Sequence, residues 1–198
     1  MPGSIKQTQE FGTPGVNTDI DNYYDKAGLV CTPILLETKR LILRAFTPAD
    51  LADLHCQLSD PDVMRYYPAV LSKEECEKWL QGILNDYQSN GFGMLAVHLK
   101  VTGEYVGQTG IMRRLVDGCE HFYLSYLMCR KFWGYGYATE AAQRILDYGF
   151  QTLGIDKVEA LIMPDNIRSI RLAERLGMQH ESTIQHRNRE HYVYTITR

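Results

Sequence analysis

The sequence predicts a single α/β (α+β) domain in which helices flank one mixed β-sheet, with the element order β-α-α-β-β-β-α-β-α-β-β. Two features of the pattern lead to this prediction. Two stretches with helical periodicity precede three short strand-like segments. After those strands the pattern alternates between helix and strand, and a strand–helix–strand unit brings parallel pairing into a sheet. We therefore expect part of the sheet to be parallel.

The first predicted elements are a strand and a helix. Residues 41–46, Leu-Ile-Leu-Arg-Ala-Phe, form the strand. The helix begins with Thr47 as its N-cap, Pro48 at its first position and Asp50 two residues later, a sequence typical of a capped helix start. The pair Asp60-Pro61 ends it.

A second helix is predicted over residues 72–90. Ser72 and Glu75 have the spacing of a capping box, and Gly91 supplies a C-terminal stop. The apolar residues of one face are Cys76, Trp79, Leu80, Ile83, Leu84 and Tyr87.

The remaining elements follow from alternating patterns and turn residues. The strands at the centre of the chain are predicted at 93–99, 105–113 and 122–129. They are followed by a helix at 139–153, a strand at 157–163, a helix at 166–176 closed by Gly177, and two strands ending at 192–197.

Composition indicates an ordinary globular protein. The 198 residues fit one domain, and 44% hydrophobic with 23% charged residues exclude a disordered acidic chain. A formal charge of −3 gives no broad basic surface for nucleic acid. The five cysteines form no CxxC pair, and no apolar run fits a signal peptide or a membrane span. We expect a cytoplasmic monomer or homodimer without disulfides or bound metal, acting apart from nucleic acid and membranes.

Residues 1–34 are predicted to be a partly flexible N-terminal extension, and residues 35–198 the folded domain. The extension is rich in Gly, Thr, Asn, Asp and Pro and shows no lasting periodicity.

The segment 129–140 carries the most distinctive chemistry. Gly134, Gly136 and Ala138, at a spacing of two, join a strand to a helix, and such small residues let the backbone approach a ligand closely. The free N–H groups of the helix's first turn carry positive partial charge and favour a phosphate. Two familiar phosphate loops do not match, because the segment has neither a Gly-Lys-Ser/Thr ending nor a complete GxGxxG pattern.

Four passages in order resemble the GCN5-related N-acetyltransferases (GNAT), in the RimJ/RimL-type branch of ribosomal-protein N-acetyltransferases. They are residues 37–44, 59–66, 133–141 and 158–177. The resemblance covers residues 35–198 and implies a splayed sheet. The pantetheine arm of acetyl-CoA would lie in the splay like an additional strand.

The resemblance also implies a set of cofactor-binding residues. The pantetheine arm would pair with the backbone of Tyr126, Leu127 and Met128, and Asn166 would hydrogen-bond it, although Asn166 is equally suited to be a helix N-cap. The loop residues assigned to the pyrophosphate end are Trp133, Gly134, Tyr135, Gly136, Tyr137, Ala138 and Thr139.

Catalytic assignments are fewer. The resemblance implies that a backbone N–H near Met128 stabilises the oxyanion. Many members of the family carry a tyrosine in the last helix as the acid for the thiolate, and Ala173 stands there in this chain. Ser169, one turn earlier, matches a serine of the branch and is our candidate partner of the thiolate or the pantetheine arm.

The general base stays unassigned from the sequence. The branch usually carries a glutamate in the strand before the loop, where this chain has Tyr123. Glu120 and His121 lie just upstream, and either one is an alternative through water. Cys129 with His121 suggests a nucleophile, but a free cysteine is more often a small buried apolar residue.

The expected activity is direct transfer of an acetyl group from acetyl-CoA to a primary amine. Two acceptors stay open, a protein N-terminus and a small molecule. The resemblance places Tyr66, Tyr67 and Tyr123 near the acceptor. A non-catalytic module that binds or senses acyl-CoA is the alternative, because Ala173 and Tyr123 depart from the family's pattern.

Overall fold

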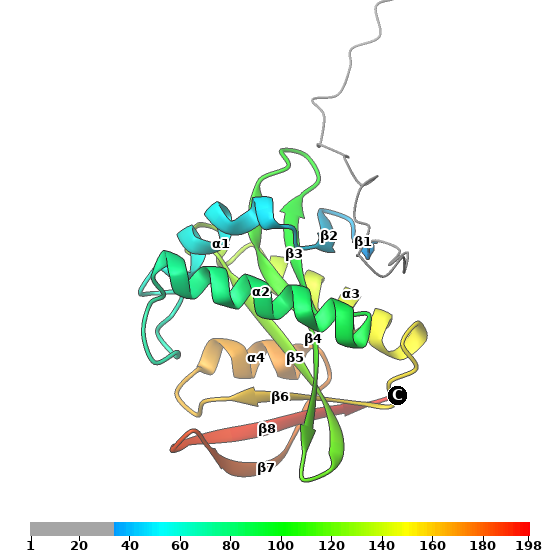
Figure 1. The fold of residues 1–198 in the computed structure, drawn as a ribbon. Coiled ribbons are helices and arrows are strands. Elements are labelled where there is room, and N and C mark those ends of the chain that lie inside the picture. The colour runs from blue at the N-terminus through cyan, green and yellow to red at the C-terminus, as the bar shows by residue number, and fades with distance from the viewer. Residues whose placement is uncertain (1–33) are drawn as a thin grey trace, which may run out of the picture. The chain divides into compact units, whose positions relative to one another are not determined.

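The computed structural model describes residues 34–198 (Figure 1). The extension expected at 1–34 lies outside this range except for Ile34, so the predicted domain boundary stays a prediction. The strands are β1 (Leu35–Glu37), β2 (Leu41–Ala45), β3 (Met94–Leu99), β4 (Tyr105–Val116), β5 (Cys119–Met128), β6 (Lys157–Ile162), β7 (Gln179–His186) and β8 (Arg189–Thr197). The helices are α1 (Leu51–Leu58), α2 (Lys73–Asn90), α3 (Tyr137–Gln151) and α4 (Ile167–Arg175), with 3₁₀ turns η1 (Pro48–Asp50) and η2 (Arg130–Phe132).

The strands form one sheet in the order β1-β2-β3-β4-β5-β6-β8-β7. All neighbours are antiparallel except β5 and β6, which confirms the expected mixed sheet. These two parallel strands are paired at a single position, Tyr123 opposite Glu159. Beyond that pair the strands separate, so the sheet is splayed between β5 and β6.

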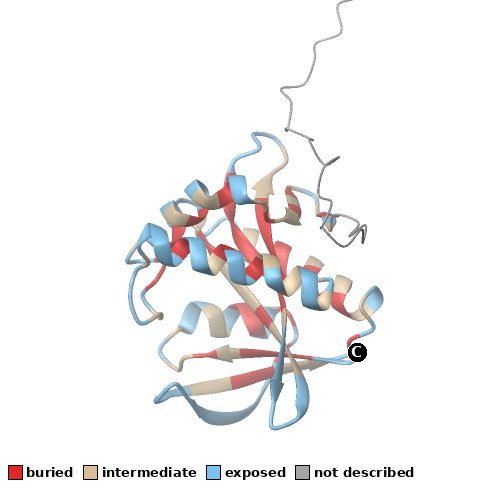
Figure 2. Ribbon diagram, viewed as in Figure 1, coloured by how far each residue is buried: buried red, intermediate tan, exposed pale blue. Residues whose placement is uncertain are grey.

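Two helical layers cover the sheet. One apolar cluster joins α3 and α4 to the sheet through residues such as Leu124, Ile145 and Leu172. A second cluster joins α1 and α2 to the opposite face through residues such as Leu54 and Ile83. Figure 1 shows α2 crossing the central strands, with β6, β8 and β7 below it in this view. Figure 2 shows that burial is concentrated in the strands between these layers.

The helix starts follow the predicted local chemistry. Thr47 and Asp50 form the predicted capping box, although the first turn is a 3₁₀ helix that leads into α1. Ser72 and Glu75 form the second predicted box at the start of α2, and Gly91 ends that helix at φ 75°. Both helices therefore begin where side-chain oxygens satisfy free backbone N–H groups.

The sequence prediction missed strand β1 and misplaced several ends. Leu36, 7% exposed, pairs with Leu43 of β2, but three residues are too few to show an alternating pattern. Helix α3 spans Tyr137–Gln151 rather than 139–153, because Gly136 in the left-handed region already ends the loop. Strand β4 extends past residue 113, and β5 begins at Cys119 rather than 122, because the two strands continue as an antiparallel hairpin.

A buried polar network fixes α1 against the strands. The Gln57 side chain, 1% exposed, donates from Nε2 to the Leu127 carbonyl at 2.6 Å. Its Oε1 accepts from the Tyr105 hydroxyl at 2.8 Å and from Gln108 Nε2 at 3.1 Å. Trp79 Nε1 of α2 in turn donates to Gln108 Oε1 at 3.3 Å. Because each buried polar group of the network has a hydrogen-bond partner, the network fixes the position of β5 relative to α1 and α2.

A glycine substitution at Gly110 tests how closely β3 and β4 approach, and one at Gly82 on α2 serves as a control. A Cβ at Gly110 would lie 2.6 Å from the Met94 Cα, so Gly110→Ala should destabilise the protein by roughly 1–3 kcal/mol. A Cβ at Gly82 of α2 would meet no other atom within 4 Å, so Gly82→Ala should stabilise by about 0.5–1 kcal/mol. Urea unfolding measures both changes. A Gly110→Ala protein as stable as the wild type would contradict the close strand packing.

Candidate active site

The loop between β5 and α3 presents a row of free backbone donors. Gly134 and Gly136 have φ of 86° and 80°, a left-handed conformation that favours glycine. Among residues 34–198, no acceptor receives a hydrogen bond from the N–H groups of residues 134–139. The loop leads directly into the N-terminus of the 15-residue helix α3. Turn geometry and helix dipole together make this a place for an anion.

A polar clamp fixes this loop to the first hairpin of the sheet. Glu140 accepts hydrogen bonds from the Thr38 hydroxyl at 2.6 Å, from the Arg40 backbone N–H at 2.9 Å and from Arg40 Nε at 2.6 Å. Arg40 Nη1 also donates to the Tyr135 carbonyl at 2.9 Å, and its guanidinium lies 4.4 Å from the centre of the Tyr137 ring. Burial works against ionisation of Glu140, but these hydrogen bonds outweigh it and lower the pKa of its carboxyl group.

The edge of β5 faces the splay with its backbone. The Cys129 N–H donates to the Val106 carbonyl of β4 at 2.8 Å. Because backbone groups of successive residues point to opposite edges of a strand, the N–H and carbonyl of Met128 point toward the gap. The Trp133 indole Nε1 donates to that carbonyl at 2.9 Å, and the Arg168 guanidinium of α4 lies 4.8 Å from the centre of the Trp133 ring.

Helix α4 closes the other side of the splay. The Asn166 side chain accepts from the Ser169 N–H at 3.2 Å, so the N-cap interpretation of Asn166 is confirmed. The Tyr126 hydroxyl donates to the Ser169 carbonyl at 3.1 Å, and burial raises the pKa of Tyr126 to about 12. Ala173 lies within this helix and is fully buried. The predicted residues Tyr126, Asn166 and Ser169 therefore meet at one place, across the gap between β5 and α4.

The predicted acceptor tyrosines lie on the opposite face of the sheet. The Tyr66 hydroxyl, from the α1–α2 connection, donates to the Asp165 carbonyl before α4 at 3.2 Å. Tyr67 packs edge-on against Trp79 with ring centres 6.1 Å apart, and its hydroxyl bonds the Ser125 side chain. Burial raises the pKa of Tyr67. The α1–α2 connection thus contacts β5 through Tyr67 and the loop that follows β6 through Tyr66.

A buried carboxylate that the sequence did not single out lies beside Tyr123. Glu159 on β6 is 7% exposed and pairs in register with Tyr123. Its Oε2 lies 2.8 Å from His121 Nδ1, and the His121 and Tyr123 rings are stacked with centres 5.9 Å apart. Burial, and then the charge of Glu159, raise the pKa of Tyr123. Glu120 instead forms an ion pair with Arg113 on the exposed hairpin.

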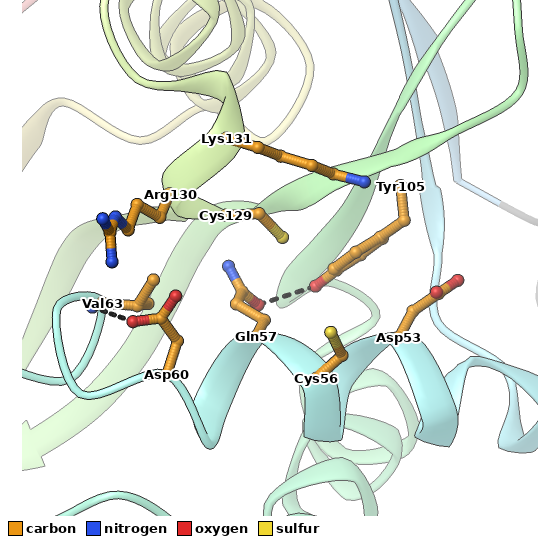
Figure 3. Close-up of a pocket in the computed structure, with 9 residues that line it drawn as sticks. All are labelled: Asp53, Cys56, Gln57, Asp60, Val63, Tyr105, Cys129, Arg130 and Lys131. Carbon is orange, nitrogen blue, oxygen red and sulfur yellow. Dashed lines mark hydrogen bonds between the residues drawn. The ribbon is translucent and has the colours of Figure 1, made fainter.

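A cavity of about 410 Å³ lies between α1 and the end of β5, away from these residues (Figure 3). Its lining residues are Asp53, Cys56, Gln57, Asp60, Val63, Tyr105, Cys129, Arg130 and Lys131. Burial raises the pKa of the Cys129 thiol to about 12, which disfavours a thiolate nucleophile. His121 is bonded to Glu159 and not to Cys129, so the suggested cysteine–histidine pair does not form.

Comparison with known proteins identifies the family. The family model described as an acetyltransferase (GNAT) domain matches residues 40–179, more than half of the chain. The uncharacterised protein YkkB of Bacillus subtilis is 38% identical over 160 residues, covering 80% of this chain and 93% of that protein. The uncharacterised N-acetyltransferase p20 of Bacillus licheniformis is 32% identical over 157 residues, covering 76% and 85%. The chain belongs to the GNAT family of N-acetyltransferases.

Solved structures share the same fold. A GNAT-family acetyltransferase from Bacillus anthracis has a TM-score of 0.70 at 29% identity, covering 83% of this chain and 98% of that one. Spermidine N-acetyltransferase from Vibrio cholerae, solved with CoA and spermine, has a TM-score of 0.68 at 18% identity, covering 81% and 96%. RimL, a ribosomal L7/L12 α-N-protein acetyltransferase solved with coenzyme A, has a TM-score of 0.67 at 18% identity, covering 83% and 98%. The resemblance to the GNAT family drawn from the sequence is confirmed.

Helix composition gives a separate finding about membranes. Within residues 34–198, no helix combines the length and the apolar character needed to cross a bilayer.

Cysteine alkylation tests the environment of Cys129. At pH 8 we expect iodoacetamide to modify the exposed Cys56 and Cys119, while Cys129 and the buried Cys76 resist. A pKa near 12 for Cys129 in place of 9 reduces the thiolate fraction about a thousandfold. Peptide mass spectrometry measures each site separately, including Cys31, which lies outside the described residues. Labelling of Cys129 as fast as that of Cys56 would contradict the burial argument.

Proposed function

We propose that this chain transfers an acetyl group from acetyl-CoA directly to a primary amine bound in the same complex. One observation supports this most strongly: a row of free N–H groups at residues 134–139 adjoins the unpaired edge of β5. The N–H groups suit the pyrophosphate of a nucleotide cofactor, and the strand edge suits an extended amide-containing arm. The residues proposed for the pyrophosphate are those from Trp133 to Thr139.

The pantetheine arm is proposed to lie against β5 at Tyr126, Leu127 and Met128. The backbone of Met128 points into the splay and can pair with the amides of such an arm. The Trp133 indole already bonds the Met128 carbonyl, so this contact would be shared or exchanged on binding. The Leu127 carbonyl is used by Gln57, so Leu127 would contribute through the position of its strand.

Residues on both sides of the gap are assigned further roles. The Met128 N–H is proposed as the donor to the oxyanion that forms on the thioester carbonyl. The Asn166 carbonyl oxygen caps α4, which leaves its NH₂ group to donate to the pantetheine arm. The Ser169 hydroxyl, on the helix α4 that borders the same gap, is proposed as the partner of the departing thiolate.

Direct transfer is favoured over a covalent acyl-enzyme. The cysteine nearest to the loop, Cys129, has a raised pKa and lines a different cavity. An enzyme that holds a thioester beside an amine needs orientation and proton transfer rather than a covalent nucleophile. Tyr66, Tyr67 and Tyr123 are proposed to border the acceptor on the face covered by α1 and α2.

Two classes of acceptor are proposed, a protein N-terminus and a small amine. Proteins that share this fold include a spermidine N-acetyltransferase and a ribosomal-protein N-acetyltransferase, so the fold accommodates both classes. Residues 1–34 are proposed to be an extension to a catalytic domain formed by residues 35–198.

A turnover assay tests the proposed function. Release of CoA thiol from acetyl-CoA is followed across a panel of polyamines, amino acids and N-terminal peptides. We expect turnover on at least one class of amine, and a loss of about tenfold or more in kcat for Ser169→Ala because a proton donor is removed. Tight CoA binding without turnover on any amine would instead support a non-catalytic acyl-CoA-binding module.

A matched pair of glycine substitutions tests the phosphate loop. Gly136 and Gly118 both have φ of 80°, so Val imposes similar backbone strain at either position. Only Gly136→Val adds a side chain to the loop where the pyrophosphate is proposed to bind, with its Cβ 3.5 Å from Arg40 Nη2, so it should abolish CoA binding measured by calorimetry. Gly118→Val, in the β4–β5 turn, should retain it. Equal affinity in the two variants would contradict the loop assignment.

A further inference from the structure

The turn between β7 and β8 carries positive charge that the fold does not neutralise. Residues 186–191 are His-Arg-Asn-Arg-Glu-His, and residues 186–190 are exposed. Among residues 34–198, no carboxylate lies within ion-pair distance of Arg187 or Arg189. Two guanidinium groups are therefore available to an anion from outside the protein.

Turn formation does not account for these arginines. The turn places Arg187 and Asn188 at φ of 52° and 59°, a left-handed conformation that Asn and Gly adopt more readily than Arg. Arg187 thus holds its position against its backbone preference. Such a departure indicates a role for the side chain rather than for the turn.

Strand β8 directs Arg189 toward the face of the acceptor tyrosines. Tyr192 and Tyr194 of β8 pack with the apolar cluster of α3 and α4. Because side chains alternate along a strand, Arg189 points to the opposite face, on which Tyr67 packs with α1 and α2. Arg189 Nη1 lies 3.8 Å from Met163 Sδ, in the loop after β6. Arg189 therefore lies at the β6 border of the gap.

The α1–α2 connection borders the same opening. The Tyr66 hydroxyl donates to the Asp165 carbonyl at 3.2 Å, in the loop that Arg189 also contacts. The Asp165 side chain is exposed. The Tyr67 hydroxyl bonds the Ser125 side chain on β5. On this face, the gap between β5 and β6 thus opens between the two tyrosines and the β7–β8 turn.

Arg187 lies close enough to this opening to act on it electrostatically. Burial raises the pKa of Tyr67, whereas the bond to Ser125 and then the charge of Arg187 act to lower it. Within the turn, burial and then the charges of Arg187 and His191 lower the pKa of His186. The turn therefore disfavours a further cation and favours an anion near the Tyr67 hydroxyl.

The distances along β5 suit an extended acceptor. An acceptor that enters from this face passes between the tyrosines and the turn to reach the thioester, which is proposed to lie at the Met128 N–H. Ser125 precedes Met128 by three residues, or about 10 Å along the strand. The second and third residues of an extended peptide lie about 3.5 and 7 Å from its first residue. Their side chains can therefore contact the turn while the N-terminal amine is at the thioester.

We infer that Arg187 and Arg189 select acceptors that carry a carboxylate close to the reacting amine. This inference rests on the proposed function. The chemistry is that of a peptide N-terminus followed by Glu or Asp, and a free acidic amino acid shares it. A polyamine carries only positive charge and is repelled by the same turn. Of the two proposed classes of acceptor, the acidic N-terminus is therefore favoured.

Three peptides of equal length but different charge test this selection. The C-terminally amidated peptides Ala-Glu-Glu-Ala, Ala-Gln-Gln-Ala and Ala-Lys-Lys-Ala are compared in the thiol-release assay, together with glutamate, glutamine and spermidine. We expect kcat/KM for the Glu peptide to exceed that for the Gln peptide by about tenfold or more, with the Lys peptide and spermidine lowest. The difference should lie in KM. It should shrink severalfold between about 0.05 and 0.5 M NaCl, because salt screens exposed charges.

Paired variants assign the preference to the turn. Arg187→Asn/Arg189→Gln should bring the Glu and Gln peptides to within about twofold of each other and leave kcat/KM for the Gln peptide unchanged. Arg187→Lys/Arg189→Lys keeps the charge and should retain most of the preference. The control Lys78→Gln/Arg198→Gln removes two other exposed cations, one on α2 and one at residue 198, and should retain the full preference.

The outcomes separate this inference from the proposed function. A wild type that turns over no amine would count against the proposed function. An active wild type that uses the three peptides equally, or that prefers the Lys peptide or spermidine, would overturn the selection by the turn. A preference that survives in Arg187→Asn/Arg189→Gln would overturn it as well. A preference for glutamate over glutamine, lost in the same variant and without a difference among the peptides, would assign the carboxylate contact to a small acceptor.

Discussion

The candidate active site depends on one constraint, which is that β5 and β6 are paired at a single position. Tyr123 and Glu159 join the antiparallel part of the sheet to the β6–β8–β7 part, and beyond them the strands separate. If the strands stayed paired along their length, the backbone N–H and carbonyl of Met128 would form hydrogen bonds with β6. Because they part, a polar strand edge is available inside the protein, next to a helix N-terminus.

The opened sheet requires supports that act over long distances in the sequence. The Gln57 network ties β5 to α1 and α2, and the Arg40–Glu140 clamp ties the loop after β5 to the first hairpin. Both use charged or buried polar groups whose partners are complete, so each holds a definite geometry. The clamp holds the loop through Glu140 and the Tyr135 carbonyl, and it takes up none of the N–H groups of residues 134–139.

Local features of the fold were predictable from the sequence, and contacts between distant segments were not. The capping boxes at Thr47 and Ser72, and the glycines at 134 and 136, act within a few residues and leave a readable pattern. The sequence separation of 100 residues between Arg40 and Glu140 leaves no such pattern. Glu159 lies within residues 158–177, one of the passages that resemble the family. Its burial beside His121 follows only from the three-dimensional pairing of β6 with β5 at Tyr123. The alternation of Glu159 with core residues at 158 and 160 is the signal that was available.

A gap in a sheet is also a pair of edge strands, and edge strands invite pairing with any extended peptide. This protein covers its internal edges with side chains rather than with another strand. Trp133 bonds the Met128 carbonyl and stacks with Arg168 from α4, while Tyr66 bonds the Asp165 carbonyl on the other border of the gap. The same side chains thus leave fewer free backbone acceptors along the gap for pairing with another extended chain.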